Sequence, residues 1–232
     1  MNDMTEEPLG RARLFRDRVE AGQVLAQCLI GYRGKDVLVL GIPRGGVPIA
    51  AEVSRVLDAD LDIIVARKLG SPLSPELAMG AVTANGGRFL NDDVIRDLQV
   101  SDEYLQQAIA REMVEARGRE ERFRGGRPPP PVQDRIVIIV DDGLATGATM
   151  RAAVRSVRLG RPALVVVAVP VGSQQACAAL RTEADELVCP YQPEPFRAIG
   201  FFYADFASTE DSEVQRILGE AYERQTARQP AG

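Results

Sequence analysis

The chain has 232 residues, a formal net charge of −5 at pH 7 and no histidine, a length that suits one large α/β domain with a buried core. The absence of histidine excludes His-based catalytic triads, His proton shuttles and His-ligated zinc. The acidic balance, with only two lysines, disfavours nonspecific nucleic-acid binding, and no apolar run approaches the roughly 18 residues of a transmembrane helix.

Cysteine usage and the N-terminus predict the compartment. Cys28, Cys177 and Cys189 are odd in number, lack C-x-x-C spacing and lie in segments predicted to be core. We therefore expect reduced packing residues. The N-terminus is rich in Asp, Glu and Arg, which is not the pattern of a signal peptide. We expect a cytoplasmic protein with neither a membrane nor a nucleic acid as partner.

Helices and strands alternate along the first third of the chain. Residues 11–30 predict an amphipathic helix, residues 37–42 a buried strand, residues 47–57 a helix with Pro48 near its first turn, and residues 61–66 another strand. The side chains of the first helix expected to face the core are Leu14, Phe15, Val19, Val24, Leu25 and Cys28.

The same alternation returns after residue 133. Residues 136–140 and 164–169 predict strands, each followed by a helix, and residues 186–189 predict a short last strand. This rhythm indicates the α/β class, with a mostly parallel, doubly wound sheet flanked by helices. From about Gln225 the composition predicts disorder.

An insertion over residues 70–133 interrupts the alternation. It contains a polar, hairpin-like piece around residues 85–90 and a long charged helix over residues 101–123, which a Gly/Pro-rich loop ends. Ile109, Met113 and Ala116 give that helix one apolar stripe, and its Glu and Arg residues favour i,i+4 pairs on a solvated face. We expect one domain over residues 1–232, with this insertion forming a helical hood and residues 190–222 a C-terminal hood segment.

The most informative segment runs from Ile136 to Leu159. Five β-branched residues predict a strand buried on both faces, and Asp141 and Asp142 follow where it ends. A loop of small residues then leads into a helix, so backbone N–H groups, the helix N-terminus and the hydroxyls of Thr146 and Thr149 form an anion cradle. The acids suit ribose hydroxyls or a hydrated Mg²⁺. Phosphate and diol together predict a ribose 5-phosphate.

This segment resembles the signature of the type I phosphoribosyltransferases, which is a hydrophobic strand, two acids, three variable residues and then Thr-Gly-Gly/Ala-Thr. Every position of that pattern is filled here. The resemblance implies that Asp141 and Asp142 face the ribose hydroxyls and hold Mg²⁺. The alternative is an ordinary strand-to-helix turn, whereas a P-loop is excluded because no Lys follows Gly147. The residues implied to bind the 5-phosphate of phosphoribosyl pyrophosphate are Gly143, Leu144, Ala145, Thr146, Gly147, Ala148 and Thr149.

The first strand is also followed by a candidate anion-binding loop. Gly45 and Gly46 let the backbone approach a ligand closely, and Arg44 can fork onto phosphate oxygens. The resemblance implies that Arg44, Gly45 and Gly46 bind pyrophosphate, often through a non-proline cis peptide in that family. A glycine-rich turn with a solvent-facing Arg is the alternative.

Lysine is rare enough in this chain to be informative. Arg67 and Lys68 end the next predicted strand and are candidates for pyrophosphate binding, and Lys35 is the second of the two lysines. A compact ammonium at Lys68 would neutralise the departing pyrophosphate, so we count Lys68 and Arg44 with the acid pair as catalytic candidates. A chance Lys on a solvated edge is the alternative, and Lys35 we assign to the surface.

The loop over residues 70–76 and the aromatic C-terminal segment complete the expected site. The resemblance implies that the loop closes over the reacting centre and excludes water. Glu76 is either a substrate or metal contact or a helix N-terminal acid. Residues 191–206 hold half of all Tyr and Phe. By a loose likeness to purine phosphoribosyltransferases, Tyr191 stacks on the acceptor, Glu194 contacts a second Mg²⁺ and Phe196 lines the acceptor site. Alternatively, these aromatic residues pack the hood against the sheet.

The sequence therefore predicts an Mg²⁺-dependent transfer of ribose 5-phosphate from phosphoribosyl pyrophosphate to a nitrogen acceptor, with a nucleobase as the expected small molecule. Positioning and charge stabilisation suffice for this chemistry. Two alternatives stay open, a non-catalytic sensor of phosphoribosyl pyrophosphate and a nucleotide phosphohydrolase on the same fold. The family resemblance implies a homodimer.

Overall fold

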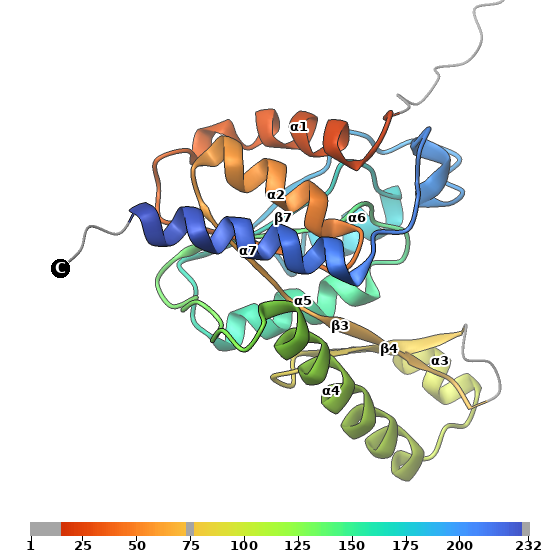
Figure 1. Ribbon diagram of the computed structural model, residues 1–232. Helices are drawn as coiled ribbons and strands as arrows, with labels where there is room; N and C mark the ends of the chain where they lie inside the picture. Colours follow the sequence, from red (N-terminus) through yellow and green to blue (C-terminus); the bar gives the residue numbers. More distant parts are fainter. Residues whose placement is uncertain (1–14, 73–76, 229–232) are drawn as a thin grey trace, which may run out of the picture.

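A five-stranded parallel sheet forms the centre of the protein, and the computed structural model describes residues 15–72 and 77–228 (Figure 1). The strand order is β2-β1-β6-β7-β8, and every neighbouring pair is parallel. The predicted doubly wound α/β sheet is confirmed. Its strands are β1 (Val37–Gly41), β2 (Asp60–Ile63), β6 (Ile136–Val140), β7 (Leu164–Ala168) and β8 (Glu186–Val188).

Helices cover both faces of this sheet because its strands are apolar on both sides. Alternate residues of a strand face opposite ways. Val39 and Ile138 therefore join the core beneath α1, α2 and α7, whereas Leu38 and Ile139 join a second core beneath α5 and α6. The helices are α1 (Arg18–Cys28), α2 (Gly46–Leu57), α5 (Ala148–Leu159), α6 (Gln174–Leu180) and α7 (Asp211–Arg228). Two 3₁₀ turns, at Ile30–Tyr32 and Ile199–Phe202, follow α1 and precede α7.

The insertion between β2 and β6 builds a second layer beyond α5. Strands β3 (Ala66–Gly70), β4 (Ala78–Thr83) and β5 (Arg88–Leu90) form an antiparallel sheet in the order β3-β4-β5. Helix α3 (Asp92–Asp97) and the long helix α4 (Asp102–Arg124) follow. Figure 1 shows α4 and the antiparallel strands extending away from the central layers.

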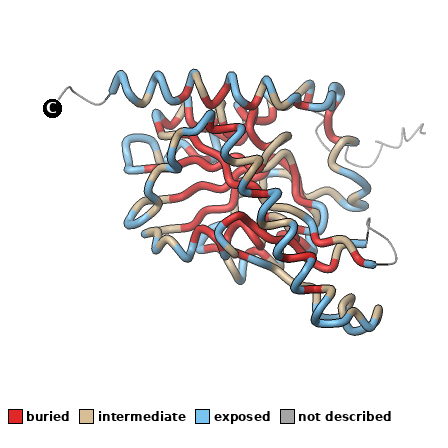
Figure 2. Tube along the Cα trace, turned by 60° about the horizontal axis from the view of Figure 1, so that its bottom comes forward, coloured by how far each residue is buried: buried red, intermediate tan, exposed pale blue. Residues whose placement is uncertain are grey.

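Helix α4 confirms the charged helix expected in the insertion. Ser101 caps its N-terminus by accepting from the Tyr104 N–H, and Gly125, at φ 60°, ends it in the left-handed conformation that favours glycine. Of the predicted apolar stripe, Ile109 and Ala116 are buried, and Met113 packs against the core of the antiparallel sheet. In Figure 2 the buried residues lie in the middle of the molecule, and the outer sides of the peripheral helices are exposed.

Several predicted boundaries and burials are wrong. Within the described residues the first helix begins at Arg18, its Val19 is 41% exposed, and Cys28 is exposed rather than in the core, while Leu14 lies outside the described residues. The predicted strand 61–66 is two pieces, because β2 ends at Ile63 and the chain then enters the other sheet. Residues 225–228 belong to α7 instead of a disordered tail. Among the described residues, no helix is long and apolar enough to cross a membrane.

Candidate functional site

The two adjacent acids lie at the carboxyl end of β6, in the centre of the parallel sheet. The Asp142 N–H donates to Asp141 Oδ1 at 2.8 Å, which fixes the first carboxylate against the chain. Loss of water raises the pKa of both carboxyl groups, and the negative charge of Asp142 raises the pKa of Asp141 further. An acid pair that is held this close attracts cations and hydroxyl donors.

The small-residue loop, by which we mean residues 143–149, follows the acids and includes the first two residues of α5. Helix α5 begins at Ala148 after Gly147, whose φ of 80° lies in the left-handed region, and no side chain caps its N-terminus. The N–H groups of a first helical turn have no intrahelical partner, so this end of α5 suits an anion. Thr146 is exposed and Thr149 half-buried at the same end.

A second loop, after β7, supports the small-residue loop from behind. The Leu144 N–H donates to Val171 O at 2.9 Å, and the Ser173 N–H donates back to Leu144 O at 2.8 Å. The Ser173 hydroxyl also donates to Ala145 O at 2.7 Å. Sequence reasoning did not find Ser173. The sequence feature that could have pointed to Ser173 is its place as a serine directly before a helix, since Ser173 is also the N-cap of α6.

The glycine-rich loop, residues 43–46, lies directly against the acid pair. The Pro43–Arg44 peptide is cis, as the family resemblance led us to expect. A Cβ on Gly45 would lie 2.0 Å from Asp142 Oδ2, and one on Gly46 would lie 2.6 Å from Val140 O. Only glycine therefore permits this close approach. The Arg44 side chain is half-exposed, 3.5 Å from Asp211 of α7.

Arg67 and Lys68 do not end a strand of the parallel sheet, which corrects the prediction. They lie inside β3, where Lys68 pairs with Ala81 of antiparallel β4. Lys68 is exposed, and its positive charge is the smallest of the influences that lower the pKa of Asp141. Arg67 instead forms an ion pair with Glu112 of α4 at 3.0 Å.

Arg18 of α1 is the neighbour of the acid pair that sequence reasoning missed. Its Nε and Nη2 donate to Asp142 Oδ2 at 3.1 and 2.8 Å. Arg18 opposes the effect of burial on the pKa of Asp142. The Tyr203 hydroxyl donates to the Asp142 carbonyl at 2.7 Å, and burial raises the pKa of Tyr203. No local pattern marks Arg18, because 124 residues separate it from its partner.

The three candidate acceptor residues lie in the C-terminal segment. Tyr191 packs edge-on against Phe15 with ring centroids 5.5 Å apart, and Phe196 packs against Phe202 at 5.4 Å. Both join the margin of the core beneath α1 and α2, whereas Glu194 is exposed. These contacts are of the kind expected if the aromatic residues pack the hood. Glu76 lies outside the described residues.

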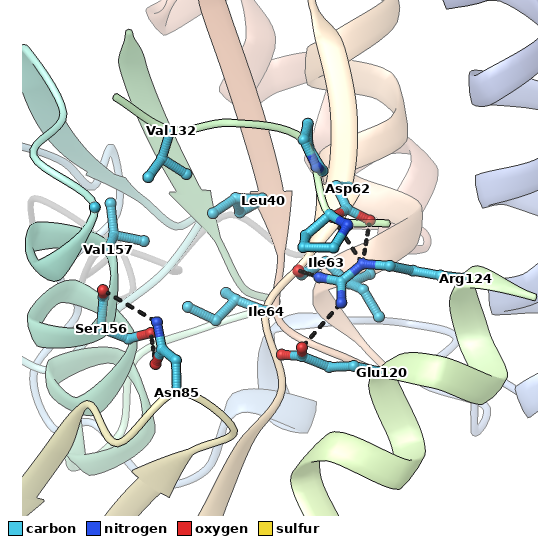
Figure 3. A pocket seen from close by; sticks show the side chains of 13 residues that line it. Leu40, Asp62, Ile63, Ile64, Asn85, Glu120, Arg124, Val132, Ser156 and Val157 are labelled. Carbon is cyan, nitrogen blue, oxygen red and sulfur yellow. Dashed lines mark hydrogen bonds and ion pairs between the residues drawn. The ribbon is translucent and has the colours of Figure 1, made fainter. Parts of the chain in front are cut away.

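A separate cavity of about 180 Å³ lies between β2, α4, α5 and the proline-rich loop (Figure 3). Its charged groups already have partners. Arg124 pairs with Asp62 and Glu120, each at 2.9 Å, and donates to Ile63 O. On the opposite wall Asn85 hydrogen-bonds Ser156. Figure 3 shows these side chains directed at one another, so we interpret the cavity as part of the packing around an ion pair.

Comparison with known proteins assigns the family. Residues 18–196 match the model of the phosphoribosyl transferase domain. A provisionally named phosphoribosyl transferase of Mycobacterium tuberculosis H37Rv, Rv0571c, is 46% identical over 210 residues, which are 90% of this chain and 47% of the relative. The chain thus spans about half the length of that curated relative.

Comparison with solved structures supports the same family and fold. The crystal structure of TT1426 from Thermus thermophilus is 43% identical with a TM-score of 0.76, covering 89% of this chain and 98% of that one. The structure of AQ2163 from Aquifex aeolicus, 11% identical with a TM-score of 0.50, covers 87% of this chain and 85% of that one and supports the fold alone. This chain belongs to the phosphoribosyl transferase domain family.

Proposed function

We propose that the protein is an Mg²⁺-dependent phosphoribosyltransferase that moves ribose 5-phosphate from phosphoribosyl pyrophosphate to a ring nitrogen of a nucleobase and releases pyrophosphate. The observation that carries the proposal is the convergence of three features. The acid pair, the uncapped N-terminus of α5 and the glycine-rich loop meet at the carboxyl edge of one parallel sheet. Ligands of open α/β sheets bind at this edge.

Each feature suits one part of the donor molecule. The small-residue loop would bind the 5-phosphate through backbone N–H groups and through Thr146 and Thr149. Asp141 and Asp142 would accept hydrogen bonds from the ribose hydroxyls. The glycine-rich loop, with Arg44, would bind the pyrophosphate. Because these sites are adjacent, the anomeric carbon would lie between the acids and the leaving group.

The acid pair also suits Mg²⁺. The described residues contain no group of three or more acidic or sulfur ligands, but Mg²⁺ is commonly held by one or two carboxylates together with substrate phosphates and water. Asp141 and Asp142 would hold the ion, whose chemistry is to neutralise charge on the phosphates. Lys68, whose charge reaches Asp141, would add a positive charge as pyrophosphate departs.

No protein nucleophile is required for this reaction. The acceptor nitrogen attacks the anomeric carbon, the bond to pyrophosphate breaks and leaves its electron pair on pyrophosphate, and the acceptor nitrogen loses its proton to water or to the pyrophosphate. The chain's part is to orient the donor and to stabilise the charge that grows on the leaving group. The site therefore needs acids, N–H donors and cations, which the acid pair, the start of α5, and Arg44 with Lys68 would supply.

The test is pyrophosphate release from phosphoribosyl pyrophosphate with Mg²⁺ and a panel of purine and pyrimidine bases. The double variant Asp141→Asn/Asp142→Asn should lose turnover by at least about 10³-fold while keeping its circular dichroism spectrum. The matched control is Asp92→Asn/Asp93→Asn, which alters the exposed adjacent acids of α3 and should leave the rate unchanged.

Each outcome has a definite meaning. Release that requires one base and is lost in the acid-pair variant supports the transferase and identifies its acceptor. No release, despite tight calorimetric binding of phosphoribosyl pyrophosphate, indicates a sensor. Phosphate release from nucleoside monophosphates alone indicates a phosphohydrolase. Full turnover in the acid-pair variant contradicts the ribose assignment.

A further inference from the structure

The environment of Arg18 joins the chain's N-terminal and C-terminal segments at the acid pair. The Phe15 N–H donates to Phe202 O at 2.8 Å, and the Ala204 N–H donates back to Phe15 O at 2.7 Å. This pairing places α1 beside the segment over residues 199–207, which we call the strap. The strap and the start of α1 thus form one unit next to the carboxyl end of β6.

Arg18 is fixed within this unit by contacts on three sides. Its Nη1 donates to Ala207 O at 2.7 Å, and its guanidinium lies over the Phe206 ring, 4.0 Å from the centroid. Its Nε and Nη2 donate to Asp142 Oδ2. Planar stacking and several simultaneous hydrogen bonds are what a guanidinium provides and an ammonium does not. The Arg18 and Asp142 side chains are only 12% and 13% exposed, so the pair is shielded from solvent.

The direction of these bonds matters for the proposed ribose site. Arg18 Nε and Nη2 both donate to one oxygen of Asp142, Oδ2. The other oxygen, Oδ1, is therefore the one that we expect to accept a hydrogen bond from a sugar hydroxyl. The Tyr203 hydroxyl holds the Asp142 carbonyl, so the backbone and the side chain are fixed independently. A Cβ on Gly45 would meet both Asp142 Oδ2 and Arg18 Nε, which places Arg18 against the glycine-rich loop as well.

We infer that Arg18 is a positioning residue of the ribose site: it holds Asp142 by Oδ2 so that Oδ1 faces the sugar diol, with Phe206 of the strap holding Arg18 in turn. This inference rests on the proposed function. It assigns the start of α1 and the strap to donor binding, in addition to the loops at the sheet edge. Without Arg18, Asp142 would keep a buried charge beside Asp141 with no cation bound to it, and its orientation for the diol would be lost.

The experiment measures two ligands by calorimetry with Mg²⁺ on the full chain. Ribose 5-phosphate is the probe of the proposed diol and 5-phosphate positions, and inorganic pyrophosphate is the probe of the glycine-rich loop. In Arg18→Met we expect ribose 5-phosphate to bind about 10- to 100-fold more weakly. Pyrophosphate affinity should stay within about twofold, which also reports that the variant is folded.

Graded variants separate positioning from simple charge. Arg18→Lys keeps a cation without the planar stacking, so it should recover only part of the lost affinity, and Phe206→Leu should show a smaller loss than Arg18→Met. The control is Arg16→Met, which removes an exposed arginine two residues before Arg18 whose ion pair is with Asp17. It should bind both ligands as the wild type does.

Three results would overturn the inference. Unchanged ribose 5-phosphate binding in Arg18→Met means that the ion pair does not serve the site. Tighter binding means that Arg18 competes with the sugar and acts as a lock. Equal weakening of both ligands means a structural role. If instead the wild type binds neither ligand, the proposed function itself fails and this inference fails with it.

Discussion

At the scale of single residues, the geometry of the site depends on the missing side chain of Gly45 as well as on the two carboxylates. Gly45 has ordinary helical backbone angles, so its identity is not explained by φ. It is explained by space, because a Cβ there would lie 2.0 Å from Asp142 Oδ2. The glycine-rich loop can therefore lie this close to Asp142 only if residue 45 has no Cβ.

Gly45→Ala should separate that loop from the acid pair. Either Asp142 or the loop must shift to accept the methyl group, so we expect phosphoribosyl pyrophosphate affinity to fall at least about 10-fold and the melting temperature to drop. Calorimetry and thermal denaturation measure the two effects. The control is Gly118→Ala in α4, where a Cβ meets nothing within 4 Å and helix propensity should add about 0.5–1 kcal/mol of stability. Wild-type affinity in Gly45→Ala would contradict the packing argument.

At the scale of elements, α4 is tied to the parallel sheet by a buried ion pair at its last turn. Arg124 bonds both oxygens of Asp62 in β2, and both side chains are about one-tenth exposed. Burial raises the pKa of Asp62 to about 6, although Arg124 opposes that shift. The ion pair therefore holds the C-terminal end of α4 against β2.

Arg124→Met should cost about 3–5 kcal/mol of unfolding free energy at pH 7.5, because it leaves the Asp62 carboxylate buried without its cation. The exposed neighbour Arg122→Met should change it by less than about 0.5 kcal/mol. Urea denaturation measures both. Equal stability of the two variants would mean that the ion pair does not hold α4 in place.

The same pair predicts a pH dependence. With a folded pKa raised above the unfolded value of about 3.9, Asp62 binds an extra proton in the folded state, so its contribution to stability is greatest below pH 4 and declines as pH rises towards 6. Losing Arg124 raises the pKa of Asp62 further. The cost of Arg124→Met should therefore be smaller at pH 5 than at pH 7.5. A cost that grows at pH 5 would contradict this sign.

At the scale of the whole molecule, α5 joins the two sheets. Its N-terminus lies at the acid pair, its inner face packs on β6 and β7, and its outer side meets the antiparallel strands (Figure 1). A close approach lies at Gly87, just before β5, where an added Cβ would lie 2.4 Å from the Ser156 Cα. The antiparallel sheet carries Lys68, so this contact places Lys68 relative to the acid pair.

Gly87→Ala should push the antiparallel sheet away from α5. We expect a loss of about 1–3 kcal/mol in unfolding free energy, since overpacking against backbone cannot be relieved by a side-chain rotation. Gly219→Ala in α7 is the control, because a Cβ there meets nothing within 4 Å. Thermal denaturation compares them, and an unchanged melting temperature in Gly87→Ala would show that the two sheets are not closely docked.

The central sheet and the strand-loop-helix segment were predictable from sequence because their signals are local. Five β-branched residues, two acids and a glycine before a helix specify β6, the acid pair and the start of α5. The exit of the chain from β2 into the antiparallel sheet was not predictable, since no Gly or Pro in residues 61–66 marks the point where β2 ends at Ile63 and β3 begins at Ala66. Contacts between residues far apart in the sequence, such as Arg18 and Asp142, produce no periodic pattern in the sequence from which they could be predicted.

A crystal structure of the protein with phosphoribosyl pyrophosphate and Mg²⁺ would test the proposed donor site most directly. We expect the 5-phosphate at residues 143–149, the ribose hydroxyls at Asp141 and Asp142, and the pyrophosphate at Arg44, Gly45 and Gly46. A donor bound elsewhere, or bound with its ribose turned away from the acid pair, would contradict the assignment of this site to phosphoribosyl pyrophosphate.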